Sequence, residues 1–261
     1  MDLLIELQHN MSQIHTLQRG VRRYSVNDYS TPMPFLPSSL VPDIKYWIKA
    51  DVGVYSDSGS AVPCNNGDLV YTWADNVGTT NFIQATTGSR PIFYTNKING
   101  LPSLRFSGTS SLNSTHISIA QIYTICMVAK PISITAQPTY QCFFNSSTNY
   151  PQLTYMNNYT TASAPYMYAG SGATLASPLS FTSFSYFVIT FNGASSKCRV
   201  NSLDNNPVGT TGTGAIQNTF LAGGPSQPLN CEISEFFMIS RILNTDEINN
   251  IEYYFKYRYN L

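Results

Sequence analysis

Two kinds of side chain in this sequence have the chemistry to bind or cleave a sugar: aromatic rings and paired carboxylates. Tyrosines are concentrated in one segment that is also rich in Asn, Ser and Thr, namely Tyr150, Tyr155, Tyr159, Tyr166 and Tyr168. An exposed tyrosine ring can stack on a sugar ring while amides and hydroxyls bind its hydroxyl groups. The candidate ligand-binding residues are therefore Tyr155, Tyr159, Tyr166 and Tyr168. The same residues also suit a strand surface or a protein interface.

The carboxylates do not form a catalytic pattern. Hydrolysis of a glycosidic bond needs two carboxylates that flank it. Glu232 and Glu235 are the closest pair, but residues three apart on a regular strand point to opposite faces. Glu235 falls on an apolar face, where either a raised pKa for catalysis or a hydrogen-bonded structural role is conceivable, and we favour the structural role. With no nucleophile, zinc-protease, phosphate-loop or dinucleotide motif present, we expect no catalytic residue and no enzyme.

Metal and cofactor chemistry is not indicated either. His9, His15 and His116 have no partners at metal-ligand spacing. The aspartates near turns lack the density of a calcium loop; they are Asp51, Asp57, Asp68 and Asp75. We expect no metal and no cofactor. The five cysteines, odd in number and without a C-x-x-C pair, are expected to be reduced, apolar core residues; they are Cys64, Cys126, Cys142, Cys198 and Cys231.

Composition narrows the class of partner. Only 11% of the 261 residues are charged, and 14 Lys and Arg balance 14 Asp and Glu, so nothing favours nucleic acid or an anionic membrane. No run approaches the roughly 18 apolar residues of a membrane span. Asp2 and Glu6 interrupt the short apolar run at the N-terminus, so we expect no signal peptide.

Residues 1–40 differ from the rest of the chain. Apolar residues occupy the a and d positions of a seven-residue repeat at Leu4, Leu7, Met11 and Ile14, and these are the candidate partner-binding residues. Fewer than three heptads make a marginal free coiled coil, so the helix either docks on another chain or packs on its own domain, and we weigh these equally. The Pro-rich stretch from Thr31 to Pro37 follows as an extended arm or linker.

From residue 41 onward, strand patterns alternate with turn clusters. Ile122–Ala129 and Phe184–Phe191 are apolar on both faces, which is typical of central sandwich strands. Other expected strands are Ile44–Ala50, Leu69–Trp73 with its odd-numbered side chains on one face, Ser103–Phe106, Tyr140–Phe144, Gln152–Met156, Lys197–Val200 and Thr219–Ala222. Turn residues separate them, including Asn192-Gly193 and Gly209–Gly214.

The C-terminal segment predicts a strand followed by a helix. In Leu229–Arg241, Cys231, Ile233, Phe237 and Ile239 are expected to share one face. Asn244 with Glu247 three residues later forms a capping-box pattern, so a helix should start there. Apolar residues then recur at helical spacing to the end of the sequence.

Ordered motifs give this chain a family resemblance. Trp47–Val54 resembles the W-x-x-A-D-x-G-V opening of bacterial and viral laminin-G-like domains, and Trp73–Gly78 is similar to their W-x-D-x-S-G turn, with Val77 in place of Ser. The stretch from Gln84 to Gly108 matches Q-A-T…R-P…N-G-x-P-x-L-x-F-x-G. Together with the closing strand and helix, these motifs resemble the concanavalin A-like lectin/glucanase superfamily, of the type found in phage and viral structural proteins. The E-x-D-x-x-E strand motif of the related endoglucanases is missing.

The resemblance implies an all-β fold, an antiparallel jelly-roll sandwich over residues 41–261 with a short C-terminal helix, and the heptad pattern and Pro-rich stretch add an N-terminal helical arm at 1–40. Our leading interpretation is a non-enzymatic virion component for capsid decoration, a head fibre or tail attachment. It would bind other virion proteins or copies of itself through residues 1–40, lie on the virion surface and contact host-surface glycan. The alternative is a non-catalytic carbohydrate-binding module of a bacterial surface or secreted protein. Fold alone does not choose between them.

Overall fold

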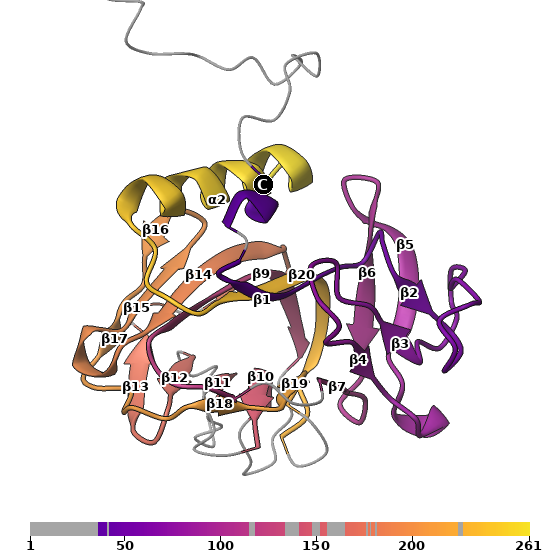
Figure 1. Cartoon of the computed structure of the whole chain (residues 1–261), viewed down its shortest axis with the longest axis horizontal. Helices are drawn as coiled ribbons and strands as arrows, with labels where there is room; N and C mark the ends of the chain where they lie inside the picture. Colours follow the sequence, from indigo (N-terminus) through magenta and orange to yellow (C-terminus); the bar gives the residue numbers. More distant parts are fainter. Residues whose placement is uncertain are drawn as a thin grey trace, which may run out of the picture. The chain divides into compact units, whose positions relative to one another are not determined.

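The computed structural model describes residues 36–261 except residues 41, 115–117, 134–140, 148–151, 156–164, 176, 178, 181 and 224–226. These residues belong to the compact unit Phe35–Leu261. Most of the predicted arm, with Leu4, Leu7, Met11 and Ile14, lies outside the described residues. The end of the predicted arm forms a short 3₁₀ helix, η1 (Pro37–Leu40), which lies beside the first strand (Figure 1).

Two antiparallel sheets form the body of the protein (Figure 1). Sheet A runs in the order β16 (Leu203–Asp204), β15 (Lys197–Val200), β14 (Ser185–Phe191), β9 (Tyr123–Ser133), β20 (Asn230–Ile239), β6 (Leu101–Phe106) and β5 (Ile92–Ile98), and β1 (Ile44–Lys49) also pairs with β20. Sheet B runs in the order β17 (Pro207–Val208), β13 (Gly172–Leu175), β12 (Tyr166–Tyr168), β11 (Gln152–Tyr155), β10 (Gln141–Ser146), β19 (Thr219–Leu221), β7 (Leu112–Ser114), β4 (Phe82–Ile83), β3 (Thr72–Trp73) and β2 (Val54–Tyr55). Short pieces complete the fold: β8 (Ser118–Ile119) paired with β18 (Ile216–Gln217), and the 3₁₀ turns η2 (Thr87–Ser89) and η3 (Gly193–Ser195).

Aromatic side chains join the two sheets at the centre of the core. Tyr46 of sheet A stacks on Phe236 of the same sheet, with ring centroids 5.9 Å apart, and meets Phe82 of sheet B edge-on at 5.2 Å. Phe144 of sheet B lies 5.7 Å from Phe236. These contacts make the two sheets one sandwich, as the sequence predicted.

The apolar pattern of the sequence predicts that five large side chains are buried in the core, and the structure confirms this for each of them. Trp73, Phe106, Phe187, Phe237 and Ile251 all have no exposed surface. The predicted reduced cysteines are free thiols, four of them buried and Cys64 half-buried.

One α-helix is present among the described residues, α2 (Thr245–Tyr259), and it lies on the outer face of sheet A (Figure 1). The predicted capping box is confirmed: the Asn244 side chain accepts from the Glu247 backbone N–H, and Glu247 accepts from the Asn244 N–H. Phe255 packs on Phe237 with ring centroids 5.7 Å apart. No helix in the described part of the chain is long and apolar enough to cross a membrane.

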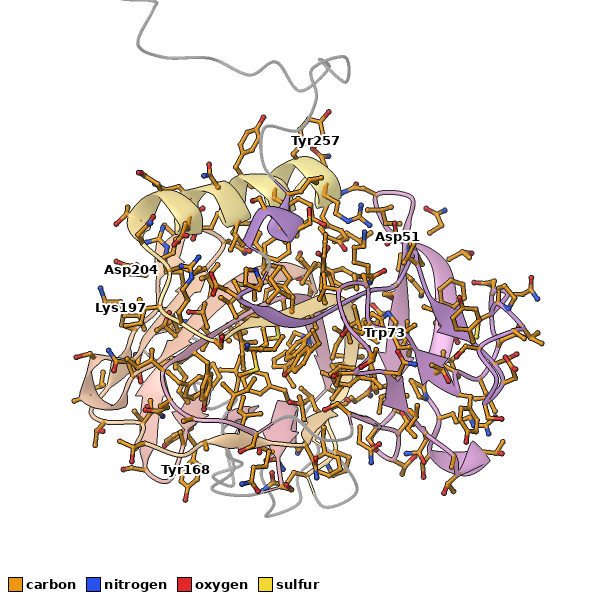
Figure 2. All side chains as sticks on the ribbon, in the orientation of Figure 1. Asp51, Trp73, Tyr168, Lys197, Asp204 and Tyr257 are labelled. Carbon is orange, nitrogen blue, oxygen red and sulfur yellow. The ribbon has the colours of Figure 1, made fainter. Side chains whose placement is uncertain are left out.

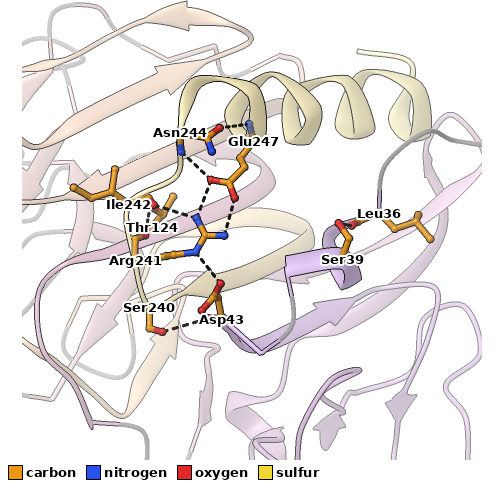
Figure 3. Close-up of polar contacts among 9 residues, drawn as sticks. All are labelled: Leu36, Ser39, Asp43, Thr124, Ser240, Arg241, Ile242, Asn244 and Glu247. Atoms are coloured by element: carbon orange, nitrogen blue, oxygen red, sulfur yellow. Dashed lines mark hydrogen bonds and ion pairs between the residues drawn. The ribbon is translucent and has the colours of Figure 1, made fainter.

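An arginine just after β20 fastens the start of α2 to the residue just before β1 (Figure 3). Arg241 Nε lies 2.8 Å from Asp43 Oδ2, just before β1, and Arg241 Nη2 lies 2.7 Å from Glu247 Oε1 in the first turn of α2. The two carboxylates raise the pKa of Arg241, and Arg241 in turn lowers the pKa of Glu247. The capping box is therefore also part of an ion-pair network.

Two predictions about which side chains lie on the same face of a strand are wrong. Leu69 and Tyr71 do not share a buried face with Trp73; Val70 is the core residue of that segment, because the regular strand β3 begins only at Thr72. In β20, a bulge lies at Ser234, since Ile233 pairs with Ala129 and Glu235 with Val128.

The bulge in β20 shifts its side-chain alternation by one residue. Cys231 and Ile233 face the core together with Phe236 and Met238, while Phe237 faces α2. Glu232 and Glu235 consequently lie on the same outer face of sheet A, not on opposite faces as predicted.

Candidate functional site

Glu235 is a fully buried carboxylate between sheet A and α2. Its side chain has no exposed surface and accepts hydrogen bonds from Trp47 Nε1 at 2.6 Å and from the Tyr254 and Tyr259 hydroxyls at 2.9 and 2.8 Å. Arg258 Nε lies 3.4 Å away. Burial raises the pKa of Glu235, while Arg258 and these hydrogen bonds oppose the rise. The donors surrounding this carboxylate come from β1 and α2, so it ties the helix to the sheet.

Two of the predicted ligand-binding tyrosines lie side by side on the outer face of sheet B. In β12, Met167 points into the core, and Tyr166 and Tyr168 lie half-buried on the other face. Figure 2 shows Tyr168 at the surface on the side of the molecule away from α2. Of Tyr155 the structure describes only the backbone, which pairs with Gln141, and Tyr159 lies outside the described residues.

A glycine on the neighbouring strand gives the two rings room. Gly172 of β13 pairs with Tyr168, and Thr174 pairs with Tyr166. A Cβ atom placed on Gly172 would lie 3.6 Å from Cδ2 of Tyr168 and 3.8 Å from Cδ1 of Tyr166. Both rings therefore extend over the bare backbone of Gly172, and together they form an aromatic surface, the tyrosine pair.

An open pocket of about 390 Å³ lies among the loops at one end of the sandwich. Its walls are the segments before β9, after β14 and before β18; they contribute Ala120, Gln121, Ile122, Asn192, Gly193, Thr213 and Ala215. Gln121 holds these loops together, because its Nε2 donates to Gly212 O at 2.9 Å and its Oε1 accepts from Gly193 N at 3.1 Å. The volume is at the small end of the range for ligand pockets.

The pocket offers uncharged polar groups and an apolar wall. Within the described residues, the Asn192 amide and the Thr213 hydroxyl have no hydrogen-bond partner, and Ile122 is 40% exposed. An amide, a hydroxyl and an aliphatic surface suit a neutral, polyhydroxylated ligand. The sequence marked Asn192-Gly193 and Gly209–Gly214 only as turns, because nothing local indicates which loops meet in space.

The pocket and the tyrosine pair are linked through one turn. Ala169, which follows Tyr168, donates its N–H to Thr211 O at 2.6 Å and accepts from Gly214 N–H at 2.8 Å. The loop at 209–215 that lines the pocket is therefore fixed against the β12–β13 turn. Among the described residues no group of three or more His, Cys, Asp or Glu side chains is placed to hold a metal ion.

No protein-family model matches this sequence, and no match is found among curated proteins. Solved structures do share its fold. The chain is similar to the binding domain of Paraclostridial mosquitocidal protein 1, at 13% identity and a TM-score of 0.55, over 85% of this chain and 53% of that one. It is also similar to domain 4 of AbnA, a GH43 extracellular arabinanase from Geobacillus stearothermophilus solved with arabinotriose, at 14% identity and a TM-score of 0.52, over 80% of this chain and 98% of that one.

A third similar structure is Trypanosoma rangeli sialidase, at 12% identity and a TM-score of 0.51, over 98% of this chain but only 39% of the sialidase. The chain thus spans well under two thirds of the sialidase and of the mosquitocidal domain. At these identities the likeness shows the fold alone, an all-β antiparallel sandwich with lectin-like neighbours.

Proposed function

We propose that the described sandwich is a non-catalytic glycan-binding module that holds its ligand against the tyrosine pair on the outer face of sheet B. The observation that carries this proposal is the pair itself: two half-exposed rings on one strand, both extending over Gly172. A shared aromatic surface of this kind can stack on the C–H face of a sugar. The arabinanase domain of the same fold, solved with arabinotriose, supports the choice of ligand class.

The adjoining pocket supplies the second half of the proposed recognition. Stacking fixes the plane of a sugar but reads few of its hydroxyls, whereas the Asn192 amide and Thr213 hydroxyl can donate to and accept from them. Because the loop at 209–215 is hydrogen-bonded to the turn after Tyr168, the two surfaces are held in a fixed relation without ligand. The ligand that we propose for these two surfaces together is a short oligosaccharide.

The test is a comparison of single tyrosine variants against a neutral oligosaccharide panel that includes arabinotriose. Tyr166→Ala and Tyr168→Ala should each weaken binding several-fold, since an aromatic stacking contact contributes about 0.5–1.5 kcal/mol beyond its buried area. Tyr257→Ala is the matched control, because Tyr257 lies half-buried on α2, over the opposite sheet (Figure 2). A panel with no ligand, or a double Tyr166→Ala/Tyr168→Ala variant that binds like the parent, would overturn the proposal.

The absence of hydrolysis belongs to the same proposal. Glu235 is surrounded by donors of its own protein and has no exposed surface, which supports a structural rather than a catalytic role. We expect no release of reducing ends from β-glucans or arabinans. Release that disappears in Glu235→Gln would contradict this expectation.

We further propose that the module is displayed on a virus particle through residues 1–40. The support is sequence alone: the opening and turn motifs resemble those of viral laminin-G-like domains, and an apolar a/d seam precedes them. A double Leu7→Asp/Ile14→Asp variant should then fail to co-sediment with particles, because it places charges in that seam. Normal co-sedimentation would favour the alternative, a module of a bacterial surface or secreted protein.

A further inference from the structure

Three positively charged side chains surround one carboxylate on the outer face of sheet A. Arg105 of β6 and Lys130 of β9 are the direct cross-strand neighbours of Glu232 in β20. Arg105 Nη1 and Lys97 Nζ lie 3.5 and 3.6 Å from Glu232 Oε1, and Lys130 Nζ lies 2.9 Å from Oε2. We call Lys97, Arg105 and Lys130 the basic triad.

The negatively charged group of this cluster is buried, whereas its positively charged groups are partly exposed. The Glu232 side chain is 1% exposed, whereas those of Lys130, Arg105 and Lys97 are 23%, 33% and 35% exposed. One cation would neutralise Glu232, so the surface presents two positive charges in excess. In a chain whose charges balance overall, this is a local concentration of positive potential.

The basic triad is also held in place before any ligand arrives. Lys97 Nζ lies 4.6 Å from the ring centre of Tyr94, and Lys130 Nζ lies 5.0 Å from that of Phe184. The buried Glu232 carboxylate forms ion pairs with all three positively charged groups. Among the described residues, Glu232 is the one hydrogen-bond partner of the Arg105 guanidinium, so most of its five N–H donors are left for another acceptor.

We infer that the basic triad is a second binding site, for the carboxylate or sulfate groups of an acidic polysaccharide. The planar fork of arginine matches the two oxygens of a carboxylate or sulfate group, and lysines on either side add charge without demanding one geometry. The site is on the opposite sheet from the tyrosine pair, so it does not depend on the proposed neutral-glycan function. The basic triad extends over three strands, β5, β6 and β9, which suits a chain polymer rather than a small enclosed ligand.

The experiment measures binding of three matched probes: a sulfated oligosaccharide, an oligogalacturonate that carries only carboxylates, and neutral dextran. The acidic probes should bind at 50 mM salt and weaken strongly at 200 mM, and dextran should not bind at this site. Inorganic sulfate should compete. Comparing the two acidic probes shows which oxyanion is preferred.

Single-residue variants then test whether the acidic probes bind at the basic triad. Lys97→Gln and Arg105→Gln should weaken acidic-probe binding at least fivefold, with the thermal midpoint of Lys97→Gln close to that of the parent. Lys197→Gln, which removes an exposed lysine from β15, next to the edge strand β16 (Figure 2), should bind like the parent, and so should Tyr166→Ala/Tyr168→Ala. The inference fails if neither acidic probe binds, if Lys197→Gln is as harmful as Lys97→Gln, or if single-stranded DNA binds as tightly as the sulfated probe.

Discussion

Glu235 shows how much depends on one buried side chain. Its folded-state pKa is raised above the ordinary 4.5, chiefly by burial. Well below pH 4.5 the Glu235 carboxyl is protonated in both the folded and the unfolded state. As pH rises from 4.5 through the folded pKa, the unfolded state loses its proton first, so this residue's contribution to stability is lost with rising pH.

A Glu235→Gln variant tests this directly. The variant should be less stable than the parent at pH 4.5, because an amide offers one acceptor oxygen to Trp47, Tyr254 and Tyr259. The gap in free energy of unfolding should narrow between pH 4.5 and 8, since only the parent must bury a charge. Urea unfolding across that range measures it, and a gap that widens with pH would show that Arg258 and the hydrogen bonds outweigh burial.

At the residue scale the sequence foresaw burial better than orientation. The burial of the five predicted core residues followed from the apolar pattern. The sequence did not predict that Glu232 and Glu235 lie on the same face of β20. One extra residue at Ser234 reverses the side-chain alternation, and no side-chain pattern marks a bulge. The basic triad was missed for a different reason: its members are far apart in sequence and are brought together only by the pairing of strands.

Helix α2 is the element whose start the sequence predicted most closely, and its cap can be tested. Asn244→Ala removes the acceptor for the Glu247 N–H and should cost about 1 kcal/mol of unfolding free energy. Asn250→Ala, at an exposed position inside the same helix, is the control and should leave stability unchanged or slightly higher. Equal losses in the two variants, measured by urea unfolding, would show that the cap contributes nothing.

The loop at 209–215 should depend on glycine at one position more than at another. Gly212 has φ +84°, and a Cβ atom there would collide with Ala169 O of the β12–β13 turn; Gly209 has φ +106° and nothing within 4 Å. Gly209→Ala should cost only the backbone strain of positive φ, roughly 1–2 kcal/mol. Gly212→Ala should cost more and weaken glycan binding too. Thermal unfolding of both variants measures the difference in stability. Equal midpoints would mean that the loop can move to accommodate a Cβ atom at Gly212 without cost.

At the element scale, predictions succeeded for the long strands that are apolar on both faces and also for some short ones, such as β15, which has the predicted bounds Lys197–Val200. The central strands β9 and β14 were located within a few residues, whereas short strands such as β12 and β13 were not predicted. Their residues are too few for a period to stand out, and they are strands because neighbours pair with them. The site on sheet B was therefore predicted as residues, but not as an arrangement.

For the molecule as a whole, we expect the sandwich to fold without its first 35 residues. Every buried apolar residue of the described part lies at Pro37 or later in the chain, so none is removed with residues 1–35. The truncated protein should unfold within about 3 °C of the full chain, the shift that roughly 1 kcal/mol produces in a domain of this size. Scanning calorimetry of both proteins measures this, and collapse of the truncated form would mean that residues 1–35 belong to the core.

The place of β20 in sheet A has a consequence for how the chain folds. This late segment pairs with β1, β6 and β9, all of which precede it by 90 residues or more, and it carries the carboxylate to which α2 is fastened. Contacts that span so much of the sequence are slow to form, because the intervening chain must be ordered first. During synthesis, β1, β6 and β9 leave the ribosome before β20, the strand with which all three pair. Until β20 is synthesised, the backbone groups that it pairs with and the apolar side chains that it covers are exposed, which favours wrong strand pairing and chaperone binding.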